Sequence, residues 1–134
     1  MKRSDLSSRM IGDAVFRQAM RLLGYTNAQG EVDGGREAGL FRRATALVNQ
    51  IYADLSAIEN GEGGEPLERL SQELPLSLRT QTDVMPYGVA MLIAQSEGDD
   101  ELQGYYASVY SQKRQAVPRR EERIGDMLPG RWLL

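Results

Sequence analysis

The sequence contains no cysteine and no histidine. Without cysteine, the chain can form neither a disulfide nor a thiolate metal site. Without histidine, it lacks the side chain most often used for general acid–base catalysis and a common ligand of transition metals. We therefore expect a protein that is not an enzyme and that uses no metal and no cofactor.

Long apolar runs and a strong charge of one sign are also missing. The longest apolar run, Val89–Ala94, is far shorter than the ~20 residues of a membrane-spanning helix. The first residues lead into no apolar core, so no secretory signal is expected and the protein is predicted to be cytoplasmic. A net charge of −3 disfavours nucleic-acid binding, because phosphate contacts require clustered Lys and Arg. We expect neither a membrane nor a specific nucleic-acid partner.

Apolar residues recur at the three- and four-residue steps of an amphipathic helix in four segments of the 134-residue chain. The pattern predicts an all-α fold, a compact bundle of four main helices plus a short helix. The main helices are expected at about Ser8–Leu23, Glu37–Glu59, Asp83–Glu97 and Asp99–Arg114, and the short one at Pro66–Gln72. The third is apolar on nearly all sides from Tyr87 to Ala94, which indicates the central, buried helix, with Met91 and Ile93 in the core. Only Leu76–Thr82 could form a strand or an extended linker.

Several polar motifs resemble sites but have structural explanations. The glycine-rich stretch Gly61–Gly64 lacks the Lys-Ser/Thr of a phosphate-binding loop and reads as a solvated loop. The acidic run Asp99–Glu101 lacks the spacing of a calcium loop and is explained by capping of the last helix. Asp13 and Asp54 are the carboxylates to inspect for paired-carboxylate chemistry, although each is expected on the surface.

The end of the chain differs from its body in charge. Residues 113–131 hold six basic and three acidic residues, a net of +3, whereas the remainder holds ten basic and sixteen acidic residues, a net of −6. Pro118 is expected to end the last helix, so we predict a helical domain over 1–117 and an irregular C-terminal docking arm over 118–134. Apolar residues in this arm require a groove, on the same chain or on a partner. The predicted partner-binding residues are Arg123, Ile124, Met127, Leu128, Arg131, Trp132 and Leu133.

Three tyrosines lie close together on the last predicted helix: Tyr105, Tyr106 and Tyr110. Core packing is the simpler explanation for Tyr106 and Tyr110. Tyrosine is also common at protein interfaces, where its ring is buried and its hydroxyl finds a partner. We therefore predict a subunit interface that uses this group.

Four runs of the sequence resemble the small head–tail connector (head-completion) proteins of tailed bacteriophages and prophages. They are Asp83–Asp99, Tyr106-x-x-x-Tyr110-x-x-Lys113-Arg114, Arg123-Ile124-x-Asp126-x-Leu128-Pro129 and, within the long helix, Leu47–Leu55. The resemblance covers about residues 45–131 and rests on pattern rather than on a catalytic motif. It implies a portal adaptor that assembles as a homo-oligomeric ring below the portal, contacts the portal protein and tail components, and passes from the host cytoplasm into the virion. The arm would then reach along the portal.

Two other functions fit the sequence. One is a small helical protein-interaction or regulatory module unrelated to virions, whose arm docks on its own body. The other is a DNA-handling protein such as a small packaging subunit, which the net charge and the lack of a helix-turn-helix pattern disfavour.

Overall fold

The computed structural model describes residues 11–119, which form an all-α bundle. Its helices are α2 (Gly12–Leu22), α3 (Gly34–Glu59), α4 (Met85–Ser96) and α5 (Asp100–Gln115), with a π-helical turn η1 (Thr80–Val84) before α4. Within the described residues, β-pairing is limited to two isolated bridges. The predicted bundle of four main helices is confirmed.

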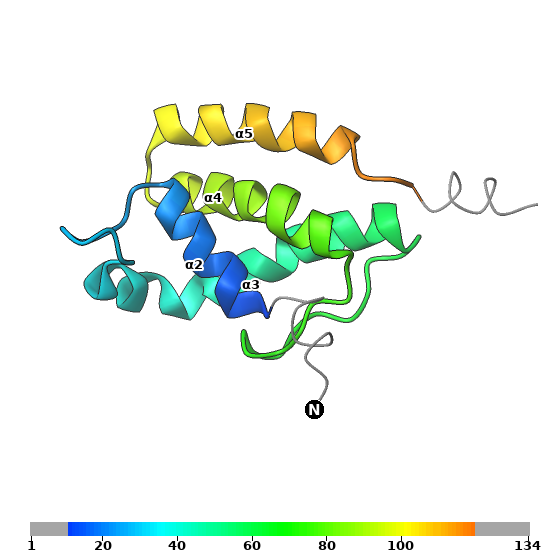
Figure 1. Ribbon diagram of the computed structural model, residues 1–134, viewed down its shortest axis with the longest axis horizontal. Helices are drawn as coiled ribbons and strands as arrows, with labels where there is room; N and C mark the ends of the chain where they lie inside the picture. Colours follow the sequence, from blue (N-terminus) through cyan, green and yellow to red (C-terminus); the bar gives the residue numbers. More distant parts are fainter. Residues whose placement is uncertain (1–10, 120–134) are drawn as a thin grey trace, which may run out of the picture.

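Helix α4 is the centre of the bundle. It lies between α5 on one side and α2 and α3 on the other (Figure 1). Ile93 is fully buried, as expected, but Met91 is only partly buried. Tyr87, one helical turn before Met91, is also partly buried, so the two residues mark the one strip of α4 that its neighbours leave partly open.

The ends of the helices follow their capping residues. Asp33 accepts hydrogen bonds from the backbone nitrogens of Gly35 at 2.9 Å and Arg36 at 3.4 Å, and α3 therefore begins earlier than the predicted Glu37. At α5, the expected capping is confirmed, because a carboxylate oxygen of Asp99 accepts from Leu102 N at 3.0 Å. The last turn of α5 carries Lys113 and Arg114, which suits the helix dipole.

The short helix predicted at Pro66–Gln72 is absent, and that prediction is wrong. Side chains satisfy the backbone there instead of helical carbonyls. Asn49 of α3 exchanges two hydrogen bonds with the backbone of Leu67, at 2.7 and 2.9 Å. The side-chain oxygen of Gln72 accepts from the nitrogens of Glu68 and Arg69. The segment is a turn-rich loop that is fixed to α3.

The prediction of an extended segment at Leu76–Thr82 is also wrong, because helical structure begins at Leu78 and continues through η1 into α4. The buried carboxylate of Glu59, in the last turn of α3, accepts from Ser77 N at 2.5 Å, from Ser77 Oγ at 2.9 Å and from Thr80 Oγ1 at 2.7 Å. These bonds fix the start of η1 against the end of α3.

The loop Gly61–Gly64 is tied to α3. Ser56 Oγ donates to the carbonyl of Glu62 at 2.8 Å. Gly64 has a φ of +72° and lies so close to the ring of Tyr52 that a Cβ atom would be 2.6 Å from its hydroxyl oxygen. A left-handed backbone and close contact both require glycine at this position. The loop is exposed but held against α3.

Candidate protein-docking site

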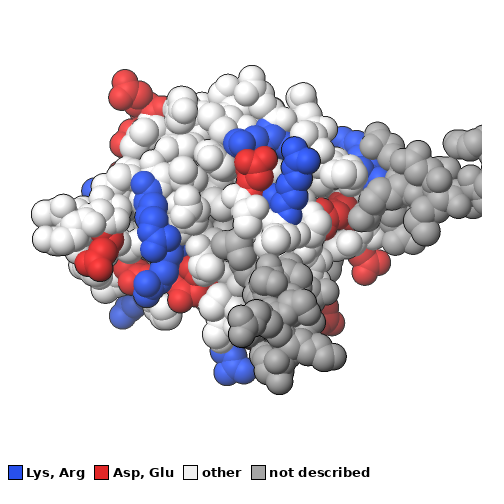
Figure 2. Space-filling view, in the orientation of Figure 1, with Lys and Arg blue, Asp and Glu red and all other residues white. Residues whose placement is uncertain are grey.

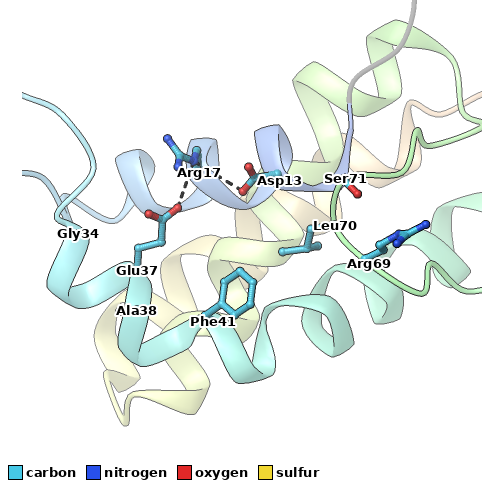
Figure 3. A pocket seen from close by; sticks show the side chains of 9 residues that line it. All are labelled: Asp13, Arg17, Gly34, Glu37, Ala38, Phe41, Arg69, Leu70 and Ser71. Atoms are coloured by element: carbon cyan, nitrogen blue, oxygen red, sulfur yellow. Dashed lines mark ion pairs between the residues drawn. The ribbon is translucent and has the colours of Figure 1, made fainter.

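An open groove of about 600 Å³ lies between α2, the first turns of α3 and the loop at residues 69–71. We call it the α2–α3 groove. Its apolar part consists of Ala38, Phe41 and Leu70. The ring of Phe41 and the methyl groups of Leu70 face one another across the groove (Figure 3). Phe41 is 64% exposed, the highest fraction among the large apolar residues described. An exposed aromatic ring beside a groove is typical of a protein contact.

The rim formed by α2 and α3 is charged. Arg17 lies between two carboxylates, 3.1 Å from Glu37 and 3.6 Å from Asp13 (Figure 3). Two carboxylates thus share one guanidinium, which leaves this rim with one net negative charge. Arg69 lies on the opposite, loop side of the groove and extends away from the ion pairs (Figure 3). Asp13 is therefore a rim residue with a cationic neighbour and has no second carboxylate in direct contact.

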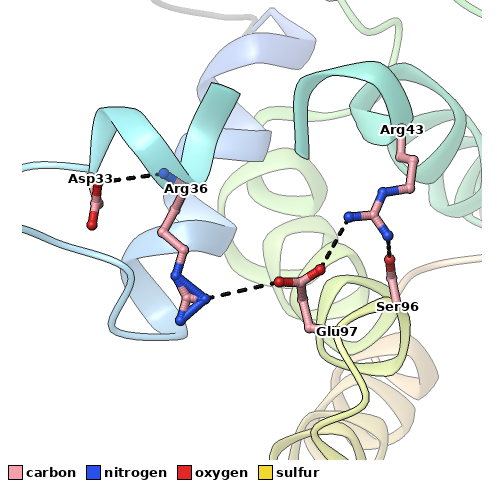
Figure 4. A network of polar contacts seen from close by, with 5 residues as sticks. All are labelled: Asp33, Arg36, Arg43, Ser96 and Glu97. Carbon is pink, nitrogen blue, oxygen red and sulfur yellow. Dashed lines mark hydrogen bonds and ion pairs between the residues drawn. The ribbon is translucent and has the colours of Figure 1, made fainter. Parts of the chain in front are cut away.

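A polar network fixes the N-terminal half of α3, and with it the groove, to the end of α4. Glu97 binds Arg43 at 3.1 Å and lies 3.9 Å from Arg36, while Arg43 also donates to Ser96 Oγ (Figure 4). The Arg36 guanidinium also stacks 3.8 Å above the ring of Tyr25. Each exposed ion pair is worth little alone, but the network connects three elements that border the groove or support it.

The three tyrosines of α5 have different positions. Tyr106 and Tyr110 are buried within this chain, at 7% and 6% exposure, and their hydroxyls donate to Leu22 O at 2.6 Å and to Asp54 at 2.7 Å. Tyr105 is 60% exposed and packs edge-on against Tyr106. Of the predicted interface group, only Tyr105 presents its ring at the surface, because the other two form the core between α5 and the rest of the bundle.

Asp54 has a structural position. Two nitrogens of Arg114 donate to its carboxylate at 2.7 and 2.8 Å, and the Tyr110 hydroxyl donates to it at 2.7 Å. The Arg114 hydrogen bonds hold the pKa of Asp54 below its ordinary value. Burial, and then the Asp54 hydrogen bond, raise the pKa of Tyr110. The cluster joins α3 to α5 and does not resemble a pair of catalytic carboxylates.

The arm residues predicted to bind a partner lie outside residues 11–119: Arg123, Ile124, Met127, Leu128, Arg131, Trp132 and Leu133. Within that range, Val117 is 5% exposed and packs against the bundle, whereas Pro118 is exposed. The predicted domain boundary lies between these two residues, and most of the predicted arm lies outside the described range.

Phe41 was not predicted as a site residue. It follows Leu40, which belongs to the apolar stripe of α3 and is buried. An apolar residue next to the stripe points about 100° away from it, and Gly34 and Ala38 on the preceding turns leave space beside the ring. The sequence could have indicated this site through an aromatic residue outside the apolar stripe, with small residues one and two helical turns before it.

Charge on the body is mixed. On the face shown in Figure 2, Lys and Arg side chains alternate with Asp and Glu side chains among the described residues. From residue 11 to residue 119, three or more acidic side chains nowhere gather in a group that could hold a metal ion. The same range contains no helix that is long and apolar enough to cross a membrane.

Comparisons with family models, with curated proteins and with solved structures gave no match to this chain.

Proposed function

We propose that this protein is a virion structural adaptor that joins the capsid portal to the tail, by assembly into a ring and by docking of its C-terminal arm, without catalysis. The observation that carries the proposal is the exposed Phe41 in the α2–α3 groove, a site of a size and apolar character suited to a protein segment. The resemblance of four sequence runs to head–tail connectors supplies the class of partner.

The rigid body is suited to assembly. Among the described residues, every buried side-chain polar atom has a hydrogen-bond partner, so the bundle needs no ligand to satisfy its interior. Tyr105 offers a second exposed aromatic surface on α5. In a ring, each subunit contacts two neighbours through two different surfaces, and the α2–α3 groove is a candidate for one of them.

Co-assembly with a portal tests this function. The proposal expects a portal gene in the genome that encodes this chain. The chain would be produced together with that portal protein, and portal rings would be isolated by sedimentation and viewed by electron microscopy. We expect an added ring of density on one face of the portal, which the variant lacking residues 118–134 would fail to form. A full-length chain that never co-sediments with the portal contradicts the proposal.

The alternative is a helical protein-interaction module unrelated to virions. One chain provides the whole α2–α3 groove, so a monomer could bind a partner there without ring assembly. A folded chain that stays monomeric and does not bind the portal, but binds an apolar peptide at Phe41, would support this alternative.

A further inference from the structure

The α2–α3 groove defines the chemistry of its occupant. Phe41, Ala38 and Leu70 provide an apolar surface that a large, rigid side chain would cover. On the α2–α3 side of the groove, Asp13 and Glu37 share Arg17, which leaves one negative charge there for a cation of the occupant to neutralise, while Arg69 lies on the opposite, loop side. The occupant therefore combines a bulky apolar residue with an adjacent Lys or Arg.

The segment Arg131-Trp132-Leu133-Leu134 of the same sequence has this combination. Trp132 is the only tryptophan in the chain, and a tryptophan buries on the order of 150–250 Å² when it docks. Arg131 precedes it directly and can approach the carboxylates of the rim. Tryptophan and arginine are among the residue types enriched in the few positions that carry most binding energy at interfaces.

We infer that residues 131–134 of one copy of this chain dock in the α2–α3 groove of a second copy. This inference rests on the ring assembly proposed above and assigns one of its contacts. It places Trp132 against Phe41 and Leu70, and Arg131 near Glu37 and Asp13.

The direction of the helices separates the point where the arm leaves the bundle from the groove. Helices α3 and α5 run the same way (Figure 1). Arg114, near the end of α5, binds Asp54 in the second half of α3, whereas Arg43 in the first half binds Glu97 at the end of α4. The chain thus leaves α5 at the end of the bundle away from Phe41. Along α3 alone, Phe41 and Asp54 are about 20 Å apart at 1.5 Å per residue.

A donor at one end and an acceptor at the other make a heterologous contact. Such contacts link copies head to tail and close into a ring when the rotation permits. The 15 residues from 120 to 134 can span at most about 50 Å when extended.

Fluorescence of the full-length protein tests the inference, because Trp132 is the only indole. We expect its emission to shift to shorter wavelength as protein concentration rises, in parallel with association measured by sedimentation velocity. Phe41→Ala should weaken the association by about tenfold or more and delay the shift accordingly. Leu78→Ala is the matched control, since Leu78 is 42% exposed and does not line the groove. Association of Phe41→Ala equal to that of the unchanged protein would overturn the inference.

Mixing two defective variants tests the head-to-tail arrangement. Phe41→Ala keeps the arm but has a weakened groove, and Trp132→Ala keeps the groove but lacks the anchor. Each alone should associate weakly, while an equimolar mixture should form a pair through its one intact contact. A mixture no larger than its components overturns the inference.

Other occupants predict different results. A short-wavelength emission that is independent of concentration would place the arm in the groove of its own chain. Loss of association on deletion of residues 1–10, with Trp132→Ala unaffected, would make the N-terminal segment the occupant. Either result overturns the inference. Portal binding is measured separately, so self-association through the groove without portal binding would support this contact and refute the proposed function.

Discussion

A Cβ atom placed on Gly88 would lie 2.7 Å from Cε1 of Tyr110 and 2.9 Å from Cδ1 of Ile51. Gly88 belongs to α4, Tyr110 to α5 and Ile51 to α3. The absent side chain is therefore what lets the central helix approach both neighbours at once. A glycine inside a helix costs roughly 1 kcal/mol relative to alanine, and this close packing offsets that cost.

Gly88→Ala should lower the free energy of unfolding by about 1–3 kcal/mol, because the methyl group would force Tyr110 and Ile51 out of their positions. Gly104→Ala is the control. Gly104 lies in α5 with open space around the position of its Cβ, so alanine there should raise stability by about 0.5–1 kcal/mol. Urea unfolding measures both, and a change of the same sign in the two variants would contradict the close contact at Gly88.

Asp54 should make stability fall in acid. Its hydrogen bonds from Arg114 lower the pKa in the folded state below the ordinary value of 3.8, so the unfolded chain binds the proton more readily. The stabilisation is present above that ordinary value and is lost as the pH falls through the lower, folded-state pKa. Asp54→Asn should remove this part of the acid dependence and cost about 1–2 kcal/mol at neutral pH, as followed by urea unfolding across pH.

The pair of Asp83 and Lys113, at 2.9 Å, provides the control for Asp54 because it also joins α5 to a neighbouring element but lies at the surface. Asp83→Asn should change stability by less than about 1 kcal/mol. If the free energy of unfolding falls as steeply with falling pH in Asp54→Asn as in the unchanged protein, Asp54 does not govern the loss of stability in acid.

Glu59→Ala should lower the free energy of unfolding by about 2–3 kcal/mol, because a backbone N–H and two hydroxyls of Ser77 and Thr80 would lose their acceptor in a buried site. Glu59→Gln keeps one acceptor oxygen and should lose less. Glu62→Ala, on the exposed loop, should stay within about 0.5 kcal/mol. Thermal and urea unfolding give the ranking, and equal effects at positions 59 and 62 would contradict the role of Glu59.

Periodicity predicted the four helices because their burial repeats with the helical step. The apolar faces of α2 and α3 follow this step, and α4 is apolar on nearly all sides because α2, α3 and α5 cover most of its surface. The connections were harder to predict. Asn49 and Glu59 are ordinary polar residues in the sequence, and only the fold brings them to the backbone of Leu67 and Ser77.

Of the residues that line the α2–α3 groove, the sequence singled out only Asp13, and as a carboxylate to inspect rather than as part of a docking site. The sequence pointed to residues 118–134 as a docking segment, since their apolar residues have no helical period. It did not point to an acceptor, because Phe41, Leu70 and Asp13 come from three segments that meet only in the folded chain. Tyr105 and Tyr106 are adjacent in sequence, yet Tyr105 is exposed and Tyr106 is buried. The packing of α5 against α4 determines which of the two side chains is buried.

Removal of residues 118–134 should leave the bundle folded with nearly unchanged thermal stability. Val117 is the last residue of the described chain that packs in the core, at 5% exposure. The matched variant therefore lacks residues 117–134, one residue more. Loss of the buried valine should cost about 1.5–3 kcal/mol, so the two truncations should melt at clearly different temperatures.

The same pair separates folding from assembly. The variant lacking residues 118–134 should keep the helical circular dichroism of the full chain and stay monomeric at concentrations where the full chain associates, because it has lost Trp132 and the arginines of the arm. Added salt should slow association of the full chain if Arg131 steers the arm to the acidic rim of the groove. A truncated chain that unfolds would show that the arm packs on its own bundle, as in the interaction-module alternative. A truncated chain that still associates would show that the bundle surface alone, with Tyr105, forms the contact.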